Sequence, residues 1–94
     1  MATRFEWDET KAAANIYNHG VSFDEAQTAF LDEWAIIYPD PDHSVREERL
    51  LILGTSHKRR LLIVSFAERG QKIRLISARK ATRAERKKYE EDFS

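Results

Sequence analysis

The sequence predicts an α+β domain in which two N-terminal helices and one C-terminal helix accompany an antiparallel sheet of about four strands. The chain has 94 residues, which gives room for a single domain, residues 1–94, with one hydrophobic core. Helix-start signals occur before residue 34 and after residue 81, whereas residues 34–77 are rich in β-branched side chains and are interrupted by short polar turns. Helices segregated from an antiparallel sheet are typical of the α+β class.

The N-terminal third predicts a short strand and two helices. Residues 5–7 (Phe-Glu-Trp) alternate apolar and polar side chains, which favours a short edge strand. Asp8 is a good N-cap for an alanine-rich helix that ends at residues 19–20 (His-Gly), where glycine suits the left-handed position after a helix. Ser22 and Glu25 form a capping-box pattern that opens a second helix. Its apolar side chains recur at helical spacing: Phe23, Ala26, Ala29 and Phe30.

The next part of the chain predicts strands joined by short turns. We expect strands at residues 34–38, 48–53, 61–67 and 72–77, with a break at residues 39–42 and a polar turn at residues 55–60. The short turns between the last three strands imply an antiparallel meander. Residues 50–53 and 61–64 are apolar without alternation, so we expect helices on both faces of the sheet. Another capping box, at Thr82 and Glu85, starts a terminal helix that continues to Tyr89.

Composition excludes several kinds of site. Without cysteine, the chain has no disulfide, no thiolate metal site and no cysteine nucleophile. His19, His43 and His57 are widely separated, and the loop with Asp40 and Asp42 is interpreted as a solvated turn, so we expect no metal site and no cofactor. No apolar run approaches the ~20 residues that cross a bilayer, and no signal peptide is apparent, so we expect a cytoplasmic protein without a membrane partner.

Charge is unevenly distributed, although the formal net charge is zero. Residues 1–56 hold 4 Lys and Arg against 11 Asp and Glu, whereas residues 57–88 hold 12 against 2. Such an asymmetry favours a polyanionic partner for the basic segment. The alternative is that these charges are solvated or pair within the fold. The zero total argues against a protein that coats duplex DNA non-specifically.

The basic segment contains most of the candidate functional residues. A metal-free ribonuclease uses the 2′-OH of its RNA substrate as nucleophile, and it needs a proton acceptor, a donor for the leaving 5′-oxygen and cations around the transition state. His57 is the candidate acid–base group, and the alternative is an ordinary exposed turn histidine. Arg79 is the preferred arginine, because it ends an apolar strand immediately before a helix start. The candidate RNA-binding residues are Lys58, Arg59, Arg74, Arg83 and Lys87.

Spacing limits which of these cations can act together. Arg74 and Arg79 face opposite sides of a regular strand, so they cannot line one pocket unless the strand ends or bulges near Ala78. Arg83 and Lys87 share one helical face. His19 is interpreted as a residue that favours the helix C-terminus rather than as a catalytic group.

Two segments resemble the signatures of the BrnT toxin family. The opening segment is Phe-Glu-Trp-Asp at residues 5–8, followed by Lys11, Asn15, His-Gly-Val-Ser-Phe at residues 19–23 and Ala26. The closing segment is Arg-Leu-Ile-Ser-Ala-Arg-Lys-Ala-Thr at residues 74–82, followed by Glu85, Arg86 and Tyr89. Glu48, Arg49 and Gly54 also match in position, so the similarity spans nearly the whole chain. Asn18 is a departure, since many relatives carry a basic residue there.

The resemblance implies a RelE-like fold and a ribonuclease that halts translation. It also implies a BrnA-type antitoxin as the partner in a hetero-oligomeric complex, which meets operator DNA only through the antitoxin. Arg79 and Arg49 are the candidate catalytic residues carried over from the resemblance, whereas His57 comes from chemistry alone.

Two other functions are compatible with the sequence. One is a non-catalytic module whose basic face binds an acidic partner protein, and the other is a DNA-binding accessory protein. The zero net charge and the absence of a helix-turn-helix pattern disfavour the second. The effect of Arg79 on RNA cleavage, as opposed to complex formation, separates the ribonuclease from the binding module.

Overall fold

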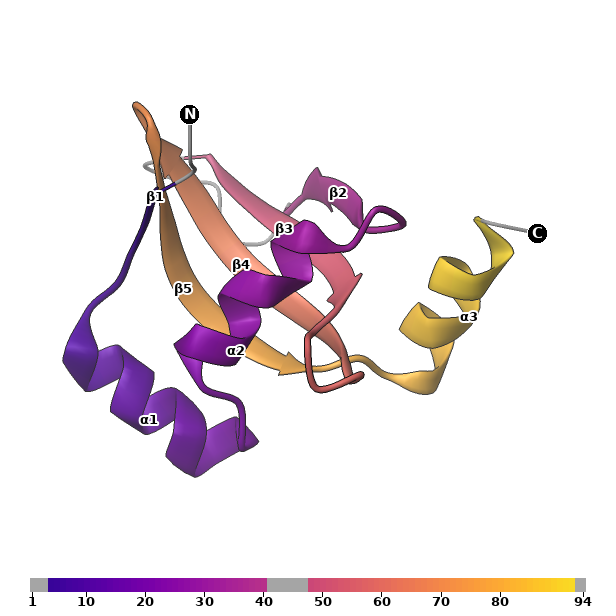
Figure 1. Cartoon of the computed structure of the whole chain (residues 1–94), viewed down its shortest axis with the longest axis horizontal. Helices are drawn as coiled ribbons and strands as arrows, with labels where there is room; N and C mark the ends of the chain where they lie inside the picture. The colour runs from indigo at the N-terminus through magenta and orange to yellow at the C-terminus, as the bar shows by residue number, and fades with distance from the viewer. Residues whose placement is uncertain (1–3, 41–47, 93–94) are drawn as a thin grey trace.

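The structure is a computed structural model that describes residues 4–40 and 48–92. Over these residues it is an α+β fold with a five-stranded mixed sheet and three α-helices (Figure 1). In chain order the elements are β1 (Arg4–Glu6), α1 (Glu9–His19), α2 (Phe23–Thr28), the 3₁₀-helix η1 (Ala29–Leu31), β2 (Ile36–Pro39), β3 (Arg49–Thr55), β4 (Leu61–Arg69), β5 (Lys72–Lys80) and α3 (Arg83–Glu91). The predicted α+β class is confirmed.

The sheet is larger than the predicted antiparallel sheet of about four strands. Strands β3 to β5 form the expected antiparallel meander, and β2 pairs antiparallel with β3. Strand β1 adds a fifth strand that pairs in parallel with β5, and the strand order is β1-β5-β4-β3-β2. Phe5 lies opposite Ile73, and the carboxylate of Glu6 accepts a hydrogen bond of 2.9 Å from Arg74. A three-residue strand carries too little pattern to reveal a partner at the far end of the chain.

Several element boundaries also differ from the prediction. Strand β2 begins at Ile36 instead of Trp34 and includes Pro39, which was expected to break it. A proline cannot donate to a neighbouring strand and is tolerated at a sheet edge, where β2 lies. Strand β5 continues beyond Ser77 to Lys80, so Arg79 lies next to the last residue of the strand, in agreement with its expected place at a strand end.

Two of the three helices have the predicted ends. Asp8 caps α1 by accepting hydrogen bonds from the next turn, and Gly20 closes the helix with φ of 68°. At α3, Thr82 and Glu85 form a complete capping box. Each cap therefore acts locally, as its sequence pattern indicates.

Helix α2 has only half of its predicted capping box. Ser22 accepts a hydrogen bond from the N–H of Glu25, but the carboxylate of Glu25 turns inward instead of returning to the cap. It accepts hydrogen bonds from the hydroxyl of Ser56 at 2.6 Å and from the guanidinium of Arg60, whose Nε lies 2.9 Å away. The hydrogen bonds from the Arg60 guanidinium are the main cause that lowers the pKa of Glu25. Burial opposes them, and the Ser56 hydroxyl makes a smaller contribution that also lowers this pKa. This ion pair fastens α2 to the turn between β3 and β4.

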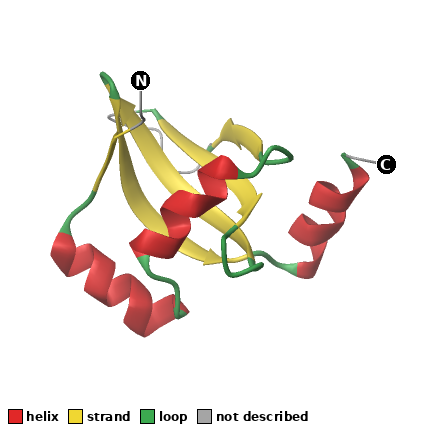
Figure 2. Cartoon of the chain, viewed as in Figure 1, coloured by secondary structure: helices red, strands yellow, loops and turns green. Residues whose placement is uncertain are grey.

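One face of the sheet is covered by α1, α2 and η1 (Figure 2). Side chains from alternate positions of β4 and β5 pack there against the helices, and edge-to-face contacts join Phe30 to both Phe5 and Phe66. The buried members of this core are Ala12, Val21, Phe23, Ala26, Ala29, Ile52, Leu62, Val64, Phe66, Leu75 and Ala78.

The opposite face is covered only in part. Tyr89 of α3 packs there on a smaller core with Leu53, Leu61 and Ile63. The predicted helices on both faces are therefore confirmed, but α3 covers one end of its face. The rest of that face is where the pocket described below opens.

Candidate functional site

A β-bulge places Arg74 and Arg79 on the same face of the sheet. Ser65 pairs with Ser77, but the next residue of β4, Phe66, pairs with Leu75, so Ile76 is an extra residue in β5. Arg74 lies opposite Ala67 and Arg79 opposite Ile63. Because β4 alternates regularly, Ala67 and Ile63 share the face turned away from α1 and α2, and so do the two arginines. The opposite faces predicted for a regular strand are therefore not found, because β5 bulges at Ile76, two residues before Ala78.

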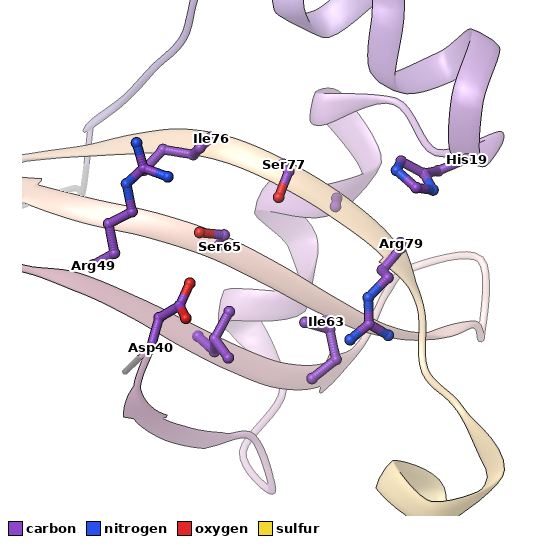
Figure 3. A pocket seen from close by; sticks show the side chains of 10 residues that line it. His19, Asp40, Arg49, Ile63, Ser65, Ile76, Ser77 and Arg79 are labelled. Atoms are coloured by element: carbon purple, nitrogen blue, oxygen red, sulfur yellow. The ribbon is translucent and has the colours of Figure 1, made fainter. Parts of the chain in front are cut away.

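A concave pocket of about 530 Å³ opens on this face (Figure 3). Its floor comes from the central strands β3, β4 and β5, with contributions from Asp40, the residue after β2, and from His19, the last residue of α1. The lining residues are His19, Asp40, Arg49, Leu51, Ile63, Ser65, Ile76, Ser77, Ala78 and Arg79.

The two candidate catalytic arginines lie at opposite ends of this pocket (Figure 3). Arg49 of β3 pairs with Ala67 of β4, and Arg79 of β5 pairs with Ile63 of β4. The two arginines are therefore two strands apart across the sheet and four residues apart along it. The strand spacings of a sheet put their Cα atoms about 17 Å apart. The hydroxyl-bearing pair Ser65 and Ser77 lies between them. The pocket thus presents two cations with small polar groups in the middle.

Arg79 is held by the first turn of α3. Its Nη1 and Nη2 donate hydrogen bonds to the two carboxylate oxygens of Glu85, both at 2.9 Å, and Nη1 also donates to the carbonyl of Lys80 at 3.2 Å. The hydrogen bonds to Glu85 raise the pKa of Arg79, and the same contact is the main cause that lowers the pKa of Glu85. Arg79 therefore remains charged and has a defined orientation.

Further contacts hold α3 beside the pocket. The hydroxyl of Tyr89 donates to Asp32 at 2.5 Å and accepts from the hydroxyl of Thr55 at 3.2 Å. The ammonium of Lys88 lies 4.3 Å from the ring centroid of Tyr38, a cation–π contact. Burial is the main cause that raises the pKa of Tyr38, followed by the nearby negative charge of Glu85.

Comparison with known proteins identifies the family. Residues 7–85 match the family model described as "Ribonuclease toxin, BrnT, of type II toxin-antitoxin system". The chain belongs to the BrnT family. Membership supports a toxin role, and a type II toxin–antitoxin family implies an antitoxin partner.

A solved BrnT structure has the same fold. The chain is similar to the crystal structure of the Brucella abortus ribonuclease toxin BrnT, with 25% sequence identity and a TM-score of 0.68. The similarity covers 87% of this chain and 100% of the Brucella BrnT chain. No match was found among curated proteins.

His57 lies away from the pocket of this BrnT-family chain. It is exposed at the turn between β3 and β4, where its backbone N–H donates to the hydroxyl of Thr28 at 2.9 Å and its Nδ1 lies 3.1 Å from the same oxygen. These contacts belong to a separate shallow hollow next to Leu31 and Asp32. Arg49 and Arg79 therefore line one pocket, whereas His57 lines a different hollow.

The remaining candidate RNA-binding residues lie outside the pocket. Arg74 shares the pocket face but pairs with Glu6. Arg83 and Lys87 are exposed on α3, and Lys58 and Arg59 are exposed in the turn before β4. Their basic neighbour in that turn, Arg60, has a structural role, since it is paired with the buried carboxylate of Glu25.

Sequence reasoning missed several residues of the pocket. His19 was interpreted only as a helix-end residue, yet it lines the pocket. Ser65 and Ser77 gave one usable signal, because Ser65 is the only polar residue in the otherwise apolar run from residue 61 to residue 67. Asp40 lies at the pocket, whereas Asp42 and His43 of the same predicted acidic loop lie outside the described residues.

Residues 4–40 and 48–92 lack two further features. They contain no group of three or more His, Cys, Asp or Glu residues that is placed to hold a metal ion. Within the same ranges, no helix is long and apolar enough to cross a membrane.

Proposed function

We propose that this chain is a metal-independent endoribonuclease toxin that cleaves RNA through the substrate's own 2′-OH and thereby inhibits translation. The observation that supports this function best is the pocket with Arg49 and Arg79 at its two ends, in a member of a family described as ribonuclease toxins. An RNA strand carries a phosphate at every nucleotide, so two separated cations match two phosphates of one strand.

The pocket offers groups for each part of this reaction. The 2′-oxygen attacks the adjacent phosphorus, and the bond from phosphorus to the 5′-oxygen of the next nucleotide breaks. The guanidinium of Arg79 stabilises the extra negative charge on the phosphorane-like transition state, and Arg49 holds the strand at the other end. His19, rather than the distant His57, is the group in the pocket suited to accept the proton of the 2′-OH and to return it to the leaving 5′-oxygen.

The flanking cations extend the surface for RNA. Arg74 lies on the same face as Arg79, and Arg83 and Lys87 are exposed on α3, next to the end of the pocket that Arg79 occupies. Lys58 and Arg59 are further from the pocket, in the turn before β4, and serve a longer RNA. Such contacts add affinity without selecting a sequence.

The partner follows from family membership. We propose that the antitoxin is of the BrnA type, that toxin and antitoxin form a hetero-oligomer, and that operator DNA is reached only through the antitoxin. The RelE-like class of metal-free ribonucleases fits this fold and this site chemistry. Because the proposed substrate is translated RNA, the toxin acts in the cytoplasm.

The first experiment is expression of the chain alone in bacteria, with growth and total-RNA integrity followed. We expect growth arrest and RNA cleavage with the wild-type chain and neither with Arg79→Ala at matched protein levels. Arg86→Ala is the matched control, because it removes the same charge from an exposed position of α3 outside the pocket. Normal growth and intact RNA with folded wild-type protein would exclude the ribonuclease.

A second experiment tests the role of the 2′-OH. We expect the purified protein to cleave a mixed-sequence single-stranded RNA oligonucleotide in the presence of EDTA. It should leave uncut an oligonucleotide of the same sequence built from 2′-deoxynucleotides. If Arg79→Ala weakens binding of a partner protein but RNA is never cut, the non-catalytic binding module becomes the better account.

A further inference from the structure

The hydrogen bonds of Arg79 divide its guanidinium into an occupied end and an open edge. A guanidinium has five N–H donors. Both donors of Nη1 are used, one on Glu85 and one on the Lys80 carbonyl, and one donor of Nη2 is used on Glu85. In the described part of the chain, no acceptor is recorded for Nε or for the second donor of Nη2.

The two remaining donors form one edge of the guanidinium plane. Nε–H and the outer Nη2–H point in nearly the same direction and form the fork that binds two oxygens of one phosphate. The Arg79 side chain is 41% exposed and lines the pocket, so this edge is reachable by a ligand. Glu85 therefore takes the end of the guanidinium and leaves a phosphate-binding edge open.

The carboxylate of Glu85 is itself fixed from the other side. Its Oε1 accepts the backbone N–H of Thr82 at 2.8 Å, while the N–H of Glu85 donates to the Thr82 hydroxyl at 3.2 Å. The capping box thus sets the position of Glu85 relative to the first turn of α3. The chain of contacts runs from the helix cap through Glu85 to Arg79.

We propose that Glu85 is a positioning residue that orients the open edge of Arg79 toward the phosphodiester that is cleaved. This inference rests on the proposed ribonuclease function. Glu85 touches no substrate and acts only through Arg79. A guanidinium without this restraint keeps its charge and still attracts RNA, but it loses the fixed orientation that stabilises a transition state.

The discriminating variant is Glu85→Gln. A glutamine at this position of a helix still completes a capping box through its amide oxygen, so α3 keeps its cap. Its amide nitrogen, however, is a donor and cannot accept from Nη2. The remaining anchors of α3, Tyr89 on Asp32 and Lys88 on Tyr38, are untouched. The variant therefore removes the second contact with Arg79 and one negative charge.

Single-turnover cleavage and binding are measured separately. We expect the cleavage rate of Glu85→Gln on the mixed-sequence RNA to fall by roughly 10–100-fold, by analogy with the loss of activity when the hydrogen-bond partner that orients a metal ligand is removed. We expect its Kd for the uncleavable 2′-deoxy oligonucleotide to stay equal to that of the wild type or to tighten, since a neighbouring negative charge is lost. Glu91→Gln, which removes the same charge from the last turn of α3, should match the wild type in both measurements.

The alternatives give different results. A cleavage rate within twofold of the wild type, or above it, overturns the positioning role, and the second result would mean that Glu85 instead blocks Arg79. A loss confined to Kd also overturns it. These outcomes are separable from failure of the proposed function, in which the wild-type protein itself cleaves nothing.

A measurement without substrate gives an independent check. In ¹⁵N NMR spectra, we expect slow rotation of the Arg79 guanidinium in the wild type and fast rotation in Glu85→Gln, with unchanged backbone signals in α3. Equal rotation in both proteins overturns the inference even where the activities differ.

Discussion

The two faces of the sheet treat polar groups in opposite ways. On the face covered by α1 and α2, a buried polar group is fully paired: the amide of Asn15 donates to the carbonyls of Val21 and Ala78 and accepts the N–H of Ala78. On the open face, the hydroxyls of Ser65 and Ser77 line a pocket. The covered face uses polar groups to fasten elements together, and the open face keeps them available for a ligand.

Both faces are built from the same strand. In β4, Leu62, Val64 and Phe66 point into the helix-covered core, while Ile63 and Ser65 face the pocket. Adjacent residues of β4 therefore have different roles: one residue packs in the core and the next lines the pocket. A substitution at residue 66 should therefore lower stability, whereas one at residue 65 should lower RNA cleavage. These two substitutions test the comparison of the two faces directly.

The largest effect on stability is expected from Phe66→Ala. Phe66 is 2% exposed and packs edge-to-face on Phe30, so truncation leaves a cavity in the main core. The free energy of unfolding should fall by about 3–5 kcal/mol in urea denaturation. Cleavage per folded molecule should stay near the wild-type value, and a specific loss of activity at equal folded protein would show that the two faces are not independent.

A smaller effect on the free energy of unfolding is expected from Arg60→Ala. This change leaves the carboxylate of Glu25, which is 1% exposed, without its cationic partner and should cost about 1–3 kcal/mol at neutral pH. Urea denaturation at pH 7 measures the loss, and Arg59→Ala in the same turn is the control.

Acidification separates the contribution of the Glu25–Arg60 ion pair to stability from the contribution of Arg60 packing. Because the folded state lowers the pKa of Glu25 below its ordinary value of 4.5, the stabilisation is complete above pH 4.5 and is lost as the pH falls toward the lowered value. The stability difference between the wild type and Arg60→Ala should therefore narrow below pH 4.5. A difference that stays constant down to pH 3 would assign the loss to packing alone.

The smallest effect on stability is expected from Ser65→Ala. The hydroxyl lies in the pocket, and its loss removes no contact of the helix-covered core. The free energy of unfolding should therefore change by less than about 1 kcal/mol. RNA cleavage should fall by roughly 2–10-fold, the value of one hydrogen bond to substrate. Wild-type activity in Ser65→Ala would remove this hydroxyl from the site, and Ser56→Ala, whose hydroxyl donates to Glu25, should show the reverse pattern.

Much of the fold could be predicted because it depends on local rules. The caps of α1 and α3 and the meander of β3 to β5 follow from caps, turns and apolar runs within a few residues of each element. The parallel pairing of β1 with β5 could not be predicted, since three residues cannot specify a partner so distant in the sequence. The half-formed cap at α2 has the same origin, because the partners of Glu25 lie in a turn more than 30 residues away.

The candidate site was predictable only in part. The family resemblance carried Arg49 and Arg79, and the structure places both in one pocket. The histidine that lines the pocket is His19, at the end of α1, and not His57. No spacing rule connects residue 19 with residue 79, so the sequence alone could not show this. The bulge at Ile76 decided that Arg74 and Arg79 share a face, and strand periodicity alone predicted the opposite.

The sequence by itself determined the class of the fold, the caps of α1 and α3 and the family, and it indicated the two arginines to test, since each of these is encoded in residue types at short or family-specific spacing. Tertiary structure alone decided which side chains meet: the fifth strand, the inward turn of Glu25, the shared face of Arg74 and Arg79, and the grip of Glu85 on Arg79. The physical reason is that local propensities act over a few residues, whereas a pocket is formed by strands that pair across the sheet.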